Sequence, residues 1–150
     1  MGLPEITLQQ IGFRILGYLL IAGVHGAVLA GAAVALGDKG PKYDGRLTVM
    51  PTNHLDLVGA ICVVFFGNGW VNPVAVDARE IRMGRLGVCL VVLAGFVSLV
   101  ALAALFHALV IPALLTLSHS AGLAASAFLR FASDLAIWMA LLSLAPVPPL

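Results

Sequence analysis

Charged side chains are scarce in this 150-residue sequence: only 10% of its residues are Asp, Glu, Lys or Arg, whereas soluble domains carry about one quarter. The formal net charge of +1 excludes the strongly basic surface that nucleic-acid binding needs. The only two cysteines, Cys62 and Cys89, lie in apolar stretches, so neither a disulfide framework nor a cysteine metal site is expected. Hydrophobic residues make up 61% of the chain, which favours an integral membrane protein.

Long apolar runs predict an all-α integral membrane fold in a single domain, 1–150. Three transmembrane helices are expected at about 11–36, 86–117 and 121–145, because each run can cross a bilayer. No Lys or Arg precedes Arg14, so the first run is interpreted as a retained helix and not as a secretory signal. Small residues crowd this helix at spacings of three and four, which lets another helix backbone approach it closely: Gly23, Gly26, Ala27, Ala30, Gly31 and Ala33.

A polar stretch at 38–85 separates the first two long helices and holds six of the eight cations: Lys39, Lys42, Arg46, Arg79, Arg82 and Arg85. Inside it, the apolar run 57–66 is too short to cross a hydrocarbon core of about 30 Å, so a short re-entrant helix is predicted. Turn residues at 67–74 predict a small loop or hairpin at the membrane edge. The positive-inside rule places 38–85 and the C-terminus in the cytoplasm and the N-terminus outside, in a multi-pass protein of the cell inner membrane.

Five short blocks follow one another along the chain. They are His25-Gly26-Ala27-Val28-Leu29, the run 50–59 (MPTNHLDLVG), the run 69–74 (GWVNPV), the run 93–99 (LAGFVSL) and the run 142–150 (LSLAPVPPL). In this order and spacing they resemble the intramembrane site-2 zinc metalloprotease family, especially its short bacterial and archaeal members. The resemblance implies a family-like loop that carries His54, Asp56, Trp70, Asn72 and Pro73, and it aligns Leu99 and Ser143 with positions where the family commonly has asparagine.

The chemistry implied by the resemblance is incomplete in this sequence. A His-Glu-x-x-His zinc site uses two histidines one helical turn apart, a glutamate as general base and a further protein ligand. His25 stands at the first histidine, but Gly26 replaces the glutamate, Leu29 replaces the second histidine, and the family's third ligand would follow Leu150. We therefore predict a degenerate member without metal, cofactor or catalytic residues, which is not an enzyme.

The resulting hypothesis is a pseudoenzyme that acts as an accessory subunit of a larger membrane complex, such as a respiratory or photosynthetic one. Its expected partners are other integral membrane subunits and lipids, and no nucleic acid. One alternative is an active intramembrane zinc metalloprotease completed by residues missing here. Another is a pigment- or haem-associated subunit that uses His25 or His107 as a ligand. A small transporter is disfavoured, because inverted repeats are absent from the sequence.

Polar residues inside the apolar runs are candidate structural contacts. Arg130 and Asp134 are four residues apart on the last helix, so an ion pair that pins this helix is predicted, with a proton or ion path as the alternative. His25 is expected to be a neutral imidazole that is hydrogen-bonded to a neighbouring helix. His54 is expected to hydrogen-bond locally with Asp56.

Overall fold

Three apolar runs of the sequence form the long helices of the structure, a computed structural model that describes residues 7–144. They are α1 (Leu8–Ala35), α4 (Arg85–Thr116) and α5 (His119–Leu144), and each is long and apolar enough to cross a membrane. The described residues contain helices and irregular segments but no strand. The predicted all-helical class with three long apolar helices is confirmed, whereas the single-domain organisation stays a prediction.

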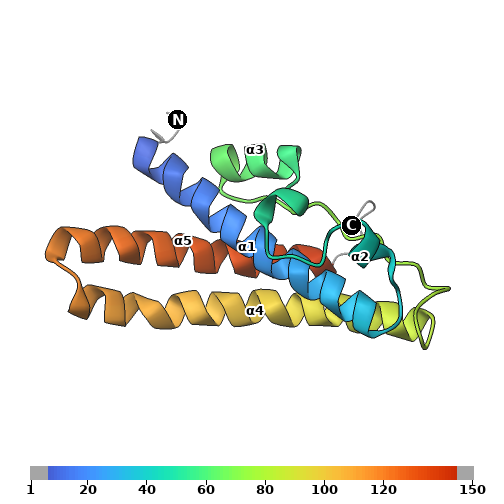
Figure 1. Cartoon of the computed structure of the whole chain (residues 1–150). Coiled ribbons are helices and arrows are strands. Elements are labelled where there is room, and N and C mark those ends of the chain that lie inside the picture. Colours follow the sequence, from blue (N-terminus) through green and yellow to red (C-terminus); the bar gives the residue numbers. More distant parts are fainter. Residues whose placement is uncertain (1–6, 145–150) are drawn as a thin grey trace.

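The helices α4 and α5 form a long antiparallel pair, and α1 crosses it obliquely (Figure 1). The Ser133 hydroxyl on α5 donates a hydrogen bond to the Ala103 carbonyl on α4 at 3.0 Å. Gly122 lies so close to the end of α4 that a Cβ there would be 3.2 Å from the Ala113 carbonyl oxygen. Small residues therefore allow the two helices to approach closely. The buried core between the three long helices includes Tyr18, Ile21, Leu99, Leu135 and Met139.

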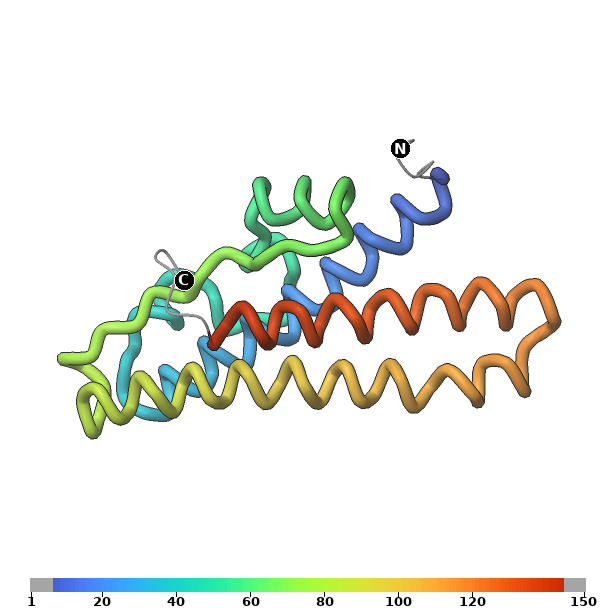
Figure 2. The backbone as a smooth tube through the Cα atoms, turned by 180° about the vertical axis from the view of Figure 1, so that it is seen from behind, coloured from blue at the N-terminus to red at the C-terminus, as the bar shows by residue number. Residues whose placement is uncertain are grey.

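Residues 36–84 fold back along α1 (Figure 2). They contain α2 (Gly40–Tyr43), a 3-10 turn η1 (Pro51–Asn53) and the short helix α3 (Leu57–Phe66). Asp56 begins α3, because its Oδ1 accepts the Gly59 N–H at 2.6 Å. Gly67 ends α3 in the left-handed region, with φ of 78°.

The fold-back begins and ends at the same end of the bundle. At this end, the Arg82 N–H donates to the Leu36 carbonyl at 2.8 Å, and the Asp77 N–H donates to Asp38 Oδ2 at 2.9 Å. At its far reach, the Arg14 guanidinium on α1 donates to the Val64 carbonyl of α3. The insertion of α3 into a membrane and the cytoplasmic side of 38–85 stay predictions. The loop or hairpin predicted at 67–74 is an extended, irregular segment in the structure, and its place at the membrane edge stays a prediction.

Candidate functional site: a cavity beside His25

His25 lies in the middle of α1 and its ring faces α4. Its Nδ1 lies 3.2 Å from the Gly95 carbonyl oxygen and 3.2 Å from Ser98 Oγ, and Ser98 itself donates to the Gly95 carbonyl at 2.7 Å. A carbonyl oxygen can only accept, so this network assigns the ring proton to Nδ1 and leaves Nε2 as an acceptor. Gly95 makes the contact possible, because a Cβ there would be 2.9 Å from His25 Cε1.

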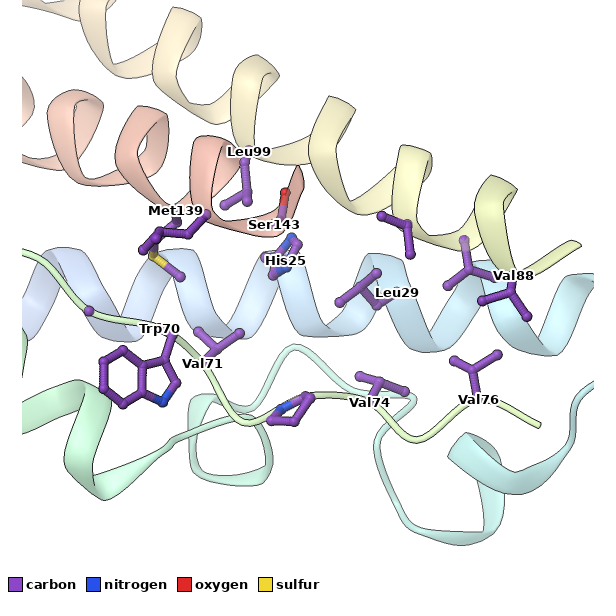
Figure 3. A pocket seen from close by; sticks show the side chains of 15 residues that line it. His25, Leu29, Trp70, Val71, Val74, Val76, Val88, Leu99, Met139 and Ser143 are labelled. Atoms are coloured by element: carbon purple, nitrogen blue, oxygen red, sulfur yellow. The ribbon is translucent and has the colours of Figure 1, made fainter. Parts of the chain in front are cut away.

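A cavity of about 150 Å³ opens beside this ring, between α1, α4, α5 and the extended segment 67–76 (Figure 3). Its wall is mainly apolar and rich in β-branched side chains. Two polar side chains, His25 and Ser143, take part in the lining. The other residues of the wall include Leu29, Trp70, Val71, Val74, Val76, Val88, Val91, Leu99, Met139 and Leu142.

Several of the sequence blocks converge on this cavity. His25 comes from the first block, Trp70 and Pro73 from the third, Leu99 from the block at 93–99, and Ser143 from the last. Positions that are far apart in the sequence therefore form one wall, including the two positions at which the family commonly has asparagine. The last block continues into residues 145–150, which lie outside the described residues.

The extended segment is held in place by hydrogen bonds to its first half. The Tyr18 hydroxyl on α1 donates to the Trp70 carbonyl at 2.9 Å, and the Asn72 N–H donates to the His54 carbonyl at 2.9 Å. The Arg46 guanidinium donates to the Asn72 carbonyl at 3.1 Å. The backbone groups of residues 74–76 have no hydrogen-bond partner within residues 7–144. Among the described residues, the second half of the segment leaves its backbone donors and acceptors unpaired beside the cavity.

His54 packs on another side of α1, against Gly26. Its side chain is fully buried, and its Nε2 lies 2.8 Å from the Thr48 carbonyl oxygen, so Nε2 carries the proton. Its Nδ1 is buried and has no hydrogen-bond partner among the described residues. A Cβ on Gly26 would overlap the imidazole, and a Cβ on Gly23 would overlap the Val49 carbonyl. The glycines of α1 were expected to pack against another helix. Gly23 and Gly26 pack against the loop at 49–54 instead.

The remaining predicted site residues lie away from the cavity. The expected local hydrogen bond between His54 and Asp56 is absent, because Asp56 caps α3 and His54 turns to α1. His107 and His119 are exposed at α4 and at the start of α5. Arg130 and Asp134 are both exposed on α5. No ion pair joins them among the interactions of residues 7–144, and their predicted pairing stays a prediction.

Sequence reasoning did not single out the groups that hold His25 and the extended segment. Tyr18 is such a group, since its hydroxyl also accepts the Asp56 N–H at 3.1 Å while it donates to Trp70. Ser98 and Gly95 are two others. Their signal in the sequence is weak, because a tyrosine, a serine or a glycine in an apolar helix is common without any role. Met139 was missed for the same reason.

Comparison with known proteins gives one informative match. The chain is 32% identical over 151 aligned residues to a protein of Bacillus subtilis (strain 168) named "Putative zinc metalloprotease YwhC", and the match covers 95% of this chain and 67% of the relative. The chain belongs to the site-2-protease-like family of this protein. No family profile matches the chain, and no solved structure matches it significantly. This site-2-protease-like chain thus shares its family with a protein that is named as a protease.

The family membership corrects one prediction. We predicted that the chain is not an enzyme, and this is wrong on the present comparison, because the relative's name points to a protease. The replacements at Gly26 and Leu29 do not by themselves establish a loss of activity. The replacement at Leu29 does remove one of the nitrogen ligands that a zinc ion would need.

The described side chains of this site-2-protease-like chain do not fit the zinc ion that the relative's name implies. Structural and catalytic zinc sites use at least three protein ligands. Within residues 7–144, no three His, Cys, Asp or Glu side chains gather where they could hold a metal ion. His25 offers one imidazole nitrogen, and Leu29, one turn further along α1, offers none.

Proposed function

We propose that this chain takes part in the cleavage of membrane proteins, and that an extended segment of the substrate binds in the cavity beside His25. The observation that carries this proposal is the segment 67–76: the backbone groups of residues 74–76 lie beside an apolar cavity and have no hydrogen-bond partner within residues 7–144. Irregular backbone at membrane depth is stable only where it is covered by protein or lines a cavity. A substrate segment that pairs with residues 74–76 would satisfy these groups.

The shape of the cavity favours an extended peptide over a helix. An α-helix with its side chains is about 10–12 Å wide, which the cavity of about 150 Å³ cannot hold. A helical substrate would have to unwind before its side chains could enter. The valines of the wall select small apolar side chains by size; they are Val71, Val74, Val76, Val88, Val91 and Val92.

The described residues account for substrate binding and for one proton-transfer group. His25 presents Nε2 as an acceptor on a ring that α4 holds in place. The apolar wall excludes water from the rest of the cavity and strengthens any hydrogen bond formed there. The wall contains no carboxylate.

The experiment compares two tryptophan variants in reconstituted bilayers. Val74→Trp fills the cavity, whereas Val97→Trp points away from the core on the exposed face of α4. Cleavage of membrane peptides that contain a helix-breaking residue is followed by mass spectrometry. The proposal predicts that Val74→Trp abolishes cleavage and that Val97→Trp retains it. Equal cleavage by both variants would show that the substrate binds elsewhere.

A place within a larger membrane complex, with other membrane subunits and lipids as partners, stays a separate prediction. A fixed set of proteins that co-purifies from native membranes would support it, and a chain that is isolated alone would count against it. A pigment or haem on His25 is not favoured, because the cavity is smaller than the roughly 300–1,000 Å³ of pockets that hold cofactors. His107 is exposed on α4 and lines no such pocket within residues 7–144.

A further inference from the structure

One face of α5 is exposed along nearly the whole helix. Its residues alternate at spacings of four and three, which is the spacing of a helix that packs along a second helix. The α5 stripe consists of Leu123, Ala127, Arg130, Asp134, Ile137 and Leu141, all exposed. The buried residues of α5 lie outside this stripe and include Ser126, Ser133, Leu135 and Met139.

The stripe carries two opposite charges near the midpoint of a helix that can cross a membrane. Arg130 and Asp134 are the twelfth and sixteenth of the 26 residues of α5, so at about 1.5 Å per residue both lie within about 4 Å of its centre. Neither has a hydrogen-bond or ion-pair partner in the part of the chain that the structure describes. The hydrocarbon core extends about 15 Å to either side of its centre, so these charges cannot remain facing lipid without a large free-energy cost.

We infer that the α5 stripe is the contact surface for a second copy of this chain. One cation and one anion on the same stripe make it self-complementary. A two-fold axis along the membrane normal places the two α5 helices side by side and parallel. Arg130 of each copy then lies one helical turn from Asp134 of the other, and two reciprocal ion pairs form.

The residues around the charges fit such a contact. Ala127 lies one turn before Arg130, and its small side chain lets the two backbones approach closely. Leu123, Ile137 and Leu141 continue the same spacing towards both ends of the helix. The alternation of four and three residues matches the left-handed crossing of parallel helices. Lipid tails offer no charge to either side chain, so lipid alone does not satisfy this surface.

Disulfide trapping in native membranes tests the contact. The two native cysteines are first replaced by serine, at Cys62 and Cys89, and Ala127→Cys is introduced. The matched control is Ala108→Cys, an exposed position on α4. Ala103 is level with Ser133 in this antiparallel pair, so Ala108 lies within about 2 Å of the depth of Ala127. The inference predicts disulfide-linked dimers for Ala127→Cys and at least about tenfold fewer for Ala108→Cys.

Charge reversal then distinguishes a symmetric dimer from other partners. Arg130→Asp leaves two acids on the stripe, and Asp134→Arg leaves two cations, so each chain alone should give at least about tenfold less dimer. The two chains expressed together should restore the dimer, which also shows that both variants fold. Dimers that persist in each single variant, or no dimer when the variants are mixed, would overturn the inference. A different protein trapped by Ala127→Cys in place of a second copy would overturn it as well.

Discussion

The imidazole of His54 fills the space that a side chain at Gly26 would need. Gly26 stands where the family resemblance places a glutamate, so the loop at 47–56 occupies this side of α1 instead. Because the His54 carbonyl also accepts the Asn72 N–H, the same residue connects α1 to the segment that lines the cavity. The packing of one ring therefore fixes the distance between α1 and the extended segment.

This packing predicts that one methyl group added at Gly26 destabilises the protein. Gly26→Ala forces its Cβ into the imidazole and should lower the free energy of unfolding by about 1–3 kcal/mol. Gly12→Ala is the matched control on the same helix, because a Cβ there meets nothing within 4 Å. The control should be neutral or stabilising by up to about 1 kcal/mol, since Ala favours helix over Gly. Denaturant unfolding in detergent measures both.

The double variant Gly26→Ala with His54→Ala identifies the cause. Removal of the ring makes room for the methyl group, so the double variant should be more stable than the sum of the two single effects by about 0.5–3 kcal/mol. Strictly additive single effects would mean that the two residues do not compete for the same space.

The contact between α4 and α5 gives a second matched pair. Ser133 and Ser126 are both buried on α5, but the Ser133 hydroxyl donates to Ala103 of α4, whereas that of Ser126 donates to Leu123 of its own helix. Ser133→Ala should therefore lose about 0.6–1.7 kcal/mol of stability, the range of interhelical hydrogen bonds in membranes. Ser126→Ala should be close to neutral. A reversed order in thermal unfolding would show that Ser133 does not stabilise the pair.

Arg14 should hold α3 against α1. Its guanidinium donates to the Val64 carbonyl near the end of α3 and lies over the Phe131 ring at 6.0 Å. Arg14→Met keeps the length of the side chain but removes the donors. The free energy needed to detach α3 from α1 should therefore fall by about 1.5–3 kcal/mol. Hydrogen exchange of the α3 amides should rise accordingly, with little change in α4. Unchanged exchange in α3 would mean that other contacts hold it.

The described residues lack a zinc site, and one substitution is predicted to raise the zinc affinity of the chain. Leu29→His places a second imidazole one turn from His25, on the side of α1 that lines the cavity. Zinc affinity should rise at least about tenfold over the unchanged chain, because two nitrogen ligands on one helix face replace one. Val28→His is the control, since Val28 does not line this cavity. Equal zinc affinity of the two variants in equilibrium dialysis would mean that His25 and a histidine at position 29 do not bind zinc together.

Apolar run length was sufficient to predict the long helices, because a bilayer imposes the number of residues that a helix needs. The short helix α3 has the bounds of the ten-residue apolar run 57–66, whereas its re-entrant insertion into a membrane stays a prediction. Motif order aligned Leu99 and Ser143 with family asparagines, but the sequence alone did not place them beside His25; the structure does. The element that packs against α1 was not predictable. Gly23 and Gly26 indicated a close approach, but the sequence does not say whether a helix or a loop approaches.

The contacts that position the cavity are long-range, which explains why they were missed. Tyr18 meets Trp70 across 52 residues, and His25 meets Ser98 across 73. No local pattern relates such pairs in a single sequence. The exposed charges of α5 were visible in the sequence, but whether their face is buried or free depends on how α4 and α1 cover the helix.

The measurement that tests the central claim most directly is photo-crosslinking from the cavity to a membrane peptide. A photoreactive residue at Val74 is compared with one at Val97 on the lipid-facing side of α4, both in reconstituted bilayers. The account predicts crosslinks from position 74 that concentrate at small apolar residues next to the helix break of the peptide, and only scattered crosslinks from position 97. Crosslinks of equal yield and scatter from both positions would contradict a substrate segment bound beside His25.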